Sequence, residues 1–271
     1  MRIIKVPWDS GSMNKNHGCQ KAPDAILKAM EDIFLNEDWQ ATGCEVYTVK
    51  TYAKDFGKTM DTIHEQALEA KEDAILLGGD HSITYPAVKA YAKNHKDGGV
   101  VMIDAHPDCE SDFEPPTHED FIRAIVNQKV IPAKRILLIG TRNLHQDEAA
   151  YLKEHGIKAI TMKRIGHEGL QRTLKDIRKT IKDWPSIYLT VDIDAADPSC
   201  APGTGYPEPG GLTTRELLTI IQALKETGKV RMADVAEANP ELDHNNMTVK
   251  LAAKITKELL RTLIKGPLNL K

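Results

Sequence analysis

Three side chains that can bind metal stand at alternate positions in one short stretch: Asp104, His106 and Asp108. The stretch directly follows an apolar, mostly β-branched run at residues 100–103, which is typical of a buried strand. Alternate residues of an extended chain share a face and lie roughly 6–7 Å apart. One ion cannot easily bind all three without a turn, whereas two ions a few ångströms apart can. We interpret this stretch as half of a dinuclear metal site.

Three other apolar runs also end in acidic residues or histidine. They precede His81, the pair Asp192 and Asp194, and Glu237. Ligands gather at the carboxyl ends of the strands in parallel α/β folds, so these side chains are expected to meet. The alternative is a set of helix N-caps, which also favour aspartate in strand-to-helix loops. Four such strand ends in one chain, with histidine at two of them, favour a site.

The candidate metal ligands are four carboxylates and two imidazoles: His81, Asp104, His106, Asp108, Asp192 and Asp194. A structural zinc site prefers thiolate ligands, and calcium is bound by oxygen ligands. A largely oxygen set with some nitrogen favours Mn²⁺, with iron, cobalt and nickel as competitors. Four carboxylates neutralise two divalent ions, and a bridging hydroxide adds one negative charge, which favours a cationic substrate. Two ions about 3.5–4 Å apart can also activate a shared water as a nucleophile.

Apolar runs that predict strands alternate with amphipathic stretches that predict helices. Strands are expected at residues 2–6, 45–49, 73–77, 99–104, 135–139, 157–161, 186–192 and 229–235. Helices are expected at residues 23–34, 56–71, 170–182, 213–227 and 247–263. This alternation predicts a parallel sheet covered on both faces, either as a closed (β/α)₈ barrel or as an open doubly wound sheet. Without a repeat or a clear linker, we expect a single catalytic domain over residues 1–271.

Composition argues against several classes of partner. The chain has 36 basic and 39 acidic residues and a formal net charge of −3, so neither nucleic acid nor a membrane surface is expected. No apolar run approaches the ~20 residues of a membrane helix, and the charged first residues are unlike a signal peptide. The four cysteines are scattered and form no C-x-x-C pair. This cysteine usage predicts a reduced, cytoplasmic protein.

The motifs around the candidate ligands resemble those of one family in the same order along the chain. They are GGDHS at residues 78–82, DAHPD at 104–108, DIDAADP at 192–198, PGTG at 202–205, PEPGGL at 207–212 and EANP at 237–240. This set is similar to the ureohydrolase family of arginases and agmatinases. The resemblance implies a three-layer, doubly wound α/β fold with a mainly parallel eight-stranded sheet. It also implies two Mn²⁺ ions per chain and hydrolysis of a guanidinium group to urea and an amine by a metal-bridging hydroxide.

Matched position by position, the resemblance assigns the six candidate ligands to the metal centre and gives two further residues roles toward the substrate. Glu237 would bind the guanidinium through paired, charge-assisted hydrogen bonds. His118 would carry a proton to the leaving amine, although Glu119 follows it where the family usually has glycine. The alternative for His118 is a surface histidine near a helix start. Thr204 would line the substrate pocket, and Asp80 would orient a metal ligand or serve structure.

The residue at position 110 points to the substrate's tail. Arginase-like members usually place asparagine there to bind the carboxylate of the substrate, whereas this chain has Glu110. A carboxylate repels an amino acid's carboxylate and attracts an amine, and Asp112 and Glu114 add negative charge to the same loop. We therefore predict a small guanidine or amidine substrate with a cationic or neutral tail, agmatine being the leading case. The alternative is that Glu110 is a solvated loop residue.

Several other activities remain open at this point. Within the family they are arginase, guanidinobutyrase and formiminoglutamase. A non-catalytic metal-binding scaffold belongs to a different class of function. A one-metal deacetylase of related fold is a further alternative, but it gives His81, Asp108 and Asp194 no role. Because family members are usually trimers or hexamers, the resemblance also implies a homo-oligomer.

Overall fold

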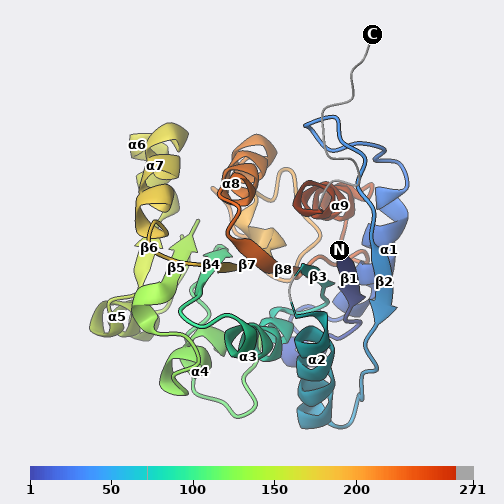
Figure 1. Cartoon of the computed structure of the whole chain (residues 1–271), viewed down its shortest axis with the longest axis horizontal. Coiled ribbons are helices and arrows are strands. Elements are labelled where there is room, and N and C mark those ends of the chain that lie inside the picture. The colour runs from blue at the N-terminus through green and yellow to red at the C-terminus, as the bar shows by residue number, and fades with distance from the viewer. Residues whose placement is uncertain (72, 261–271) are drawn as a thin grey trace.

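One open sheet of eight strands organises the described part of the chain, residues 1–71 and 73–260, in this computed structural model (Figure 1). The strands are β1 (Arg2–Lys5), β2 (Glu45–Thr48), β3 (Ala74–Leu77), β4 (Gly99–Ile103), β5 (Ile136–Ile139), β6 (Lys158–Ile160), β7 (Ile187–Asp192) and β8 (Val230–Ala236). Their order in the sheet is β2-β1-β3-β8-β7-β4-β5-β6. Every pairing between these strands is parallel.

Helices cover both faces of the sheet (Figure 1). They are α1 (Ala22–Met30), α2 (Phe56–Ala70), α3 (Thr84–Asn94), α4 (Phe121–Asn127), α5 (Gln146–His155), α6 (Met162–Glu168), α7 (Leu170–Thr180), α8 (Thr214–Glu226) and α9 (Met247–Leu259). α1, α7, α8 and α9 pack in one layer, and α2, α3 and α4 pack in the other. No helix of the described residues is both long and apolar enough to cross a membrane.

Alternate side chains of each strand enter two separate apolar cores. On β3, Ile75 and Leu77 join the core beneath α1, α8 and α9. Ala74 and Leu76 face the opposite core, beneath α2 and α3. Burial of both faces explains why these strands read as continuous apolar runs rather than as alternating ones.

The predicted three-layer, doubly wound fold is confirmed, and the barrel alternative is wrong. β2 and β6 are free edges of an open sheet, whereas a barrel has none. Each predicted strand overlaps one observed strand. Four helices, α3 to α6, lie outside the predicted helical stretches. α3 is buried on seven of its eleven residues, and its exposed residues gather at its end, so its sequence lacks the continuous polar face that marks an amphipathic helix.

Two predicted helices are too long. The one expected at residues 23–34 ends at Met30, because the Ile33 amide donates to the Met30 carbonyl in a tight turn, and Phe34 is 81% exposed. The one expected at residues 247–263 ends at Leu259, where Leu260 turns to extended backbone. Residues 261–263 of that prediction lie outside the described residues.

Candidate active site

The candidate site lies at the carboxyl ends of β3, β8, β7 and β4, which are neighbours in the middle of the sheet. His81 opens a 3₁₀ turn after β3, and Glu237 follows β8. Asp192 ends β7, and Asp104 follows β4. Because parallel strands present their carboxyl ends at one edge of the sheet, residues far apart in sequence meet here.

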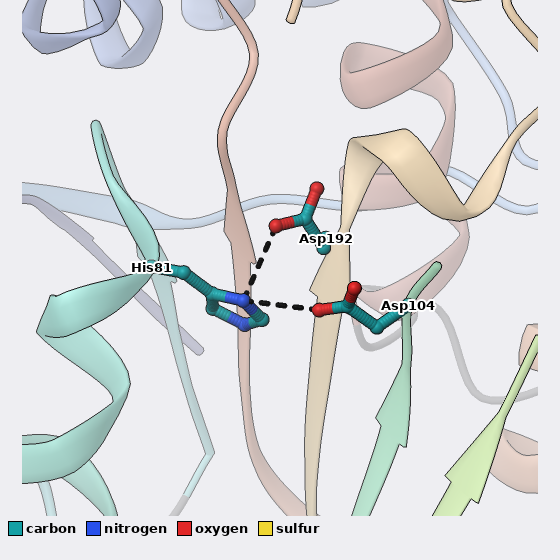
Figure 2. A group of neighbouring side chains, drawn as sticks. All are labelled: His81, Asp104 and Asp192. Atoms are coloured by element: carbon teal, nitrogen blue, oxygen red, sulfur yellow. Dashed lines mark ion pairs between the residues drawn. The ribbon is translucent and has the colours of Figure 1, made fainter. Parts of the chain in front are cut away.

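A first donor set surrounds the imidazole of His81. Its Nδ1 lies 3.2 Å from Asp104 Oδ2, 3.0 Å from Asp108 Oδ2 and 3.2 Å from Asp192 Oδ2. Figure 2 shows the Asp104 and Asp192 carboxylates converging on this nitrogen. All four side chains are buried. Three of these atoms, His81 Nδ1, Asp104 Oδ2 and Asp108 Oδ2, make no hydrogen bond to any described residue.

A second donor set adjoins the first. His106 Nδ1 lies 3.0 Å from Asp194 Oδ2 and 3.6 Å from Asp104 Oδ1. Asp104 therefore offers Oδ2 to the first set and Oδ1 to the second. In the triads His81, Asp104 and Asp192, and Asp104, His106 and Asp194, the donor atoms all lie within 4.8 Å of one another.

The electrostatics of this cluster suit bound cations. Burial raises the pKa of Asp108 and Asp192, and the neighbouring carboxylates raise each pKa further. Like charges packed in a buried space repel one another unless a positive charge joins them. Orphaned ligand atoms, oxygen and imidazole donors and crowded carboxylates together fit a metal centre.

A hydroxyl and a buried carboxylate fix the Nε2 side of the His81 imidazole, opposite the three carboxylates. His81 Nε2 lies 2.6 Å from Thr190 Oγ1, and Thr190 Oγ1 donates to Asp234 Oδ1 at 2.6 Å. Asp234 also accepts hydrogen bonds from the hydroxyls of Tyr188 and Thr84. Because the Thr190 proton points to Asp234, the Thr190 oxygen accepts from His81 Nε2. This tautomer leaves the Nδ1 lone pair facing the carboxylates.

Asp80 does not orient the imidazole beside it. Its Oδ1 accepts hydrogen bonds from the amide and the hydroxyl of Ser82 and so caps the turn that carries His81. Gly79 makes this turn possible, because a Cβ at that position would lie 1.7 Å from the carbonyl oxygen of Trp8. Asp80 thus has the structural role and not the orienting one.

Glu237 and His118 form a buried pair beside the donor sets. Glu237 Oε1 lies 3.0 Å from His118 Nδ1 and accepts from the His81 amide at 2.6 Å, and its Oε2 accepts from Asn16 Nδ2 at 2.6 Å. His118 is 4% exposed, so the alternative of a surface histidine is wrong. Burial lowers the pKa of His118, but the neighbouring carboxylates, Glu237 first and then Asp80 and Glu119, together raise it to about 9.

Two residues of this cluster have strained backbone. Asp108 and Glu237 adopt left-handed backbone, with φ of 48° and 65°. Such conformations cost a side-chain-bearing residue about 1–2 kcal/mol, and they are typical of functional sites. The surrounding hydrogen bonds, such as that from the Glu237 amide to the Gly79 carbonyl at 2.7 Å, hold the strained geometry.

A cavity of about 120 Å³ opens beside the two donor sets. His118 and Glu237 line it together with Glu110 and Thr204. Seven of its lining residues carry carboxylates, and none of the described lining residues is lysine or arginine. The cavity is therefore suited to a cation.

The predicted substrate-contacting residues differ in their surroundings. Thr204 is buried in the cavity wall, whereas the Glu110 side chain is 37% exposed and lies 3.8 Å from His145 Nδ1. Asp112 and Glu114 do not line the cavity and instead accept hydrogen bonds from side chains of α4 and its end. Their charge lies on the loop but outside the pocket.

The sequence prediction missed several residues that build the site. They are Asn16, Glu119, Thr190, Tyr206 and Asp234. Asp234 carries a detectable signal, since it is a carboxylate inside an apolar strand. Glu119 departs from the glycine that the family usually has there, but that departure alone gives it no role. Asn16, Thr190 and Tyr206 have ordinary polar side chains in unremarkable local sequence, so only their contacts across the fold identify them.

Comparison with known proteins decides the family. The sequence model of the arginase family matches residues 1–261. The chain belongs to the arginase family. Arginase-family proteins are metal-dependent hydrolases of guanidino and amidino C–N bonds, and this chain is such an enzyme.

Several relatives illustrate the range of the arginase family. The arginase of Bacillus subtilis (strain 168) is 30% identical over 288 residues, which cover 95% of this chain and 96% of that protein. The crystal structure of formimidoylglutamase from Bacillus subtilis subsp. subtilis str. 168 superposes with a TM-score of 0.89 at 27% identity, covering 95% of this chain and 85% of that one. Agmatine ureohydrolase of Thermoplasma volcanium gives a TM-score of 0.82 at 26% identity, covering 95% and 87%.

Membership of the arginase family answers two of the alternatives. A non-catalytic scaffold is set aside because the related proteins are named as enzymes. The one-metal deacetylase gives no role to His81, Asp108 and Asp194, yet all three belong to the two donor sets. The relatives do not decide the substrate, because their names cover different guanidines and amidines.

Proposed function

We propose that this arginase-family hydrolase cleaves the guanidinium group of agmatine, or of a similar amine-tailed guanidine, to urea and an amine. The observation that carries the proposal is the charge of the cavity beyond the proposed metal ligands and Glu237. Three further carboxylates line it, Glu110, Glu119 and Glu148, and its described lining residues include no lysine or arginine. A substrate with a carboxylate tail would meet like charge here. A substrate with a second cation would meet opposite charge.

We assign two Mn²⁺ ions to the two donor sets. His81, Asp104, Asp108 and Asp192 would hold one ion, and Asp104, His106 and Asp194 would hold the other. Oxygen and imidazole donors without thiolate suit Mn²⁺. When bound, such a pair supplies hydroxide as a nucleophile near neutral pH.

The chain's own residues bind the guanidinium and move the proton. Asn16 occupies one acceptor position of Glu237 Oε2, so that oxygen can accept an N–H bond from the guanidinium and help to fix its planar carbon. His118 Nε2 is buried and has no hydrogen-bond partner among the described residues, while Nδ1 is held by Glu237. His118 can therefore give a proton from Nε2 to the amine nitrogen as the C–N bond breaks.

A substrate panel tests this proposal. We expect the Mn²⁺-loaded protein to release urea from agmatine with a kcat/KM at least about tenfold above that for arginine or 4-guanidinobutyrate. Formamide release from formiminoglutamate should be weaker still. Elemental analysis of the same sample should find two metal equivalents per chain. Preference for arginine, 4-guanidinobutyrate or formiminoglutamate would overturn the proposed substrate.

The quaternary state and the organisation of the chain are also proposals. From the resemblance we propose a trimer or hexamer of one catalytic domain per chain. Sedimentation velocity of the metal-loaded protein tests the assembly, and a monomer at micromolar concentration would contradict it.

A further inference from the structure

Tyr206 and Glu119 join two loops across the cavity. Tyr206 lies in the loop between β7 and α8, and Glu119 lies just before α4, at the end of the loop that follows β4. The Tyr206 hydroxyl donates to Glu119 Oε1 at 2.6 Å, and both residues line the cavity. This bond fixes the position of a carboxylate where the arginase family usually has glycine.

The ring of Tyr206 lies between two histidines of the site. It stacks on His118 with ring centroids 5.9 Å apart and planes 20° apart, and it meets His106 edge-on at 5.6 Å. Gly205 allows this placement, because a Cβ there would come within 2.8 Å of the Asn16 Cβ. The aromatic ring therefore forms a fixed wall beside the proton-carrying histidine.

Glu119 and Glu110 present their carboxylates from neighbouring backbone. The Glu110 amide donates to the Glu119 carbonyl at 3.1 Å, and both side chains line the cavity with exposed fractions of 26% for Glu119 and 37% for Glu110. Tyr206 engages one oxygen of Glu119. Two partly buried carboxylates beside a fixed aromatic ring form a surface that attracts an ammonium group.

We propose that Glu119 and Tyr206, together with Glu110, form the wall that selects the cationic tail of the substrate. This inference rests on the proposed function and extends it to specificity. Glu119 supplies charge, and Tyr206 fixes that charge and packs against the carbon chain. Carboxylate-tailed guanidines are rejected by the same two charges.

The variant E119Q tests the wall with three guanidines that share a similar carbon chain: agmatine, n-butylguanidine and 4-guanidinobutyrate. We expect the ratio of kcat/KM for agmatine to that for n-butylguanidine to fall about tenfold, mainly through KM. The relative rate with 4-guanidinobutyrate should rise. D112N is the matched control, since Asp112 lies on the same loop outside the cavity. An unchanged ratio in E119Q, or an equal change in D112N, overturns the proposal.

The variant Y206F separates the effect of the Glu119 charge from the effect of the hydrogen bond that holds Glu119 in place. It keeps the ring but removes the hydrogen bond to Glu119, so we expect a smaller loss of selectivity, about threefold. A uniform loss of kcat on all three substrates in Y206F and E119Q would instead mean that the pair only positions His118, and would contradict the specificity role.

Binding of 1,4-diaminobutane distinguishes failure of the wall from failure of the proposed function. By titration calorimetry, we expect E119Q to weaken this diamine about tenfold while n-butylamine changes little. If the wild type hydrolyses no guanidine of the panel, the proposed function fails, and diamine binding still decides the wall. If the wild type hydrolyses agmatine but E119Q binds the diamine normally, only the wall is wrong.

Discussion

At the scale of single residues, the site depends on which nitrogen of each histidine is free. His81 turns Nδ1 toward three carboxylates because Thr190 and Asp234 occupy its other side. The hydroxyl of Thr190 has one proton, which it donates in a hydrogen bond to Asp234. The hydrogen bond between Thr190 and His81 must therefore run from His81 Nε2 to the Thr190 oxygen. A neutral residue thus sets the donor capacity of a proposed metal ligand.

Replacement of Thr190 tests this arrangement. T190V removes the acceptor for His81 Nε2 and one donor to Asp234, so we expect Mn²⁺ affinity to fall about 10–100-fold. The metal-free protein should also lose about 1–3 kcal/mol of unfolding free energy, because buried polar groups lose partners. T190S keeps the hydroxyl and is the control. Wild-type Mn²⁺ affinity in T190V, measured by chelator competition, would contradict the relay.

The residues predicted from sequence are those whose chemistry is unusual for their local setting. His81, Asp104 and Asp192 stand at the ends of apolar strands, where a buried polar or charged side chain requires a compensating partner. Asn16 and Tyr206 lack such a signal, because their roles arise from contacts across the fold. Asn16 reaches Glu237 over 221 residues of sequence. Local patterns carry no information about such contacts.

At the scale of elements, the end of β3 is the most constrained part of the site. Here the chain runs so close to the segment after β1 that only glycine fits at position 79. The Gly79 amide donates to the Val6 carbonyl at 3.2 Å, and the Asp80 amide donates to the Trp8 carbonyl at 2.9 Å. These contacts place the turn that begins with His81.

The variant G79A should be strongly destabilised. The added Cβ would overlap the Trp8 carbonyl, so the backbone must move, and we expect a loss of about 3 kcal/mol of unfolding free energy. G166A is the matched control, because nothing lies within 4 Å of a Cβ at Gly166 inside α6. That change should stabilise by about 0.5–1 kcal/mol. Urea unfolding of the metal-free variants measures both, and equal stabilities would refute the steric argument.

The strands were easier to predict than the helices for a physical reason. Strands buried on both faces leave apolar runs that neighbouring residues alone reveal. Helix ends depend on how the backbone turns and packs in the whole fold. The apolar spacing continues past Met30 to Phe34, yet the backbone turns away and exposes Phe34. The sheet order cannot be read from any local pattern and was not predicted, and the choice of an open doubly wound sheet over a barrel came from the family resemblance.

At the scale of the whole molecule, one ion pair ties an early loop to late helices. Arg215 of α8 binds Glu37 through both of its terminal nitrogens, at 2.6 and 2.9 Å. The Glu37 amide donates to buried Glu258 of α9 at 2.9 Å. The hydrogen bond from Arg215 is the main cause that lowers the pKa of Glu37 from 4.5 to about 2.

This pair predicts a pH dependence of stability. Because the folded-state pKa of Glu37 lies below its ordinary value, its contribution is complete above about pH 4.5 and is lost as the pH falls toward 2. The Glu37 side chain is 31% exposed, so solvent screening limits the effect to about 1 kcal/mol.

E37Q should be less stable than the wild type at pH 7, and the difference should shrink below pH 4.5. E226Q, at a more exposed and longer pair, is the control. A pH-independent difference for E37Q would contradict this linkage.

The order of strands in the sheet also determines when metal can be captured during protein synthesis. β8 and β7 stand between β3 and β4 in the sheet, although they follow the other six described strands along the chain. A nascent polypeptide that has emerged only through β6 carries His81 and Asp104 but lacks the two strands that set their separation. It also lacks Asp192 and Asp194. The two donor sets are therefore complete only after β7 and the residues that follow it have been synthesised.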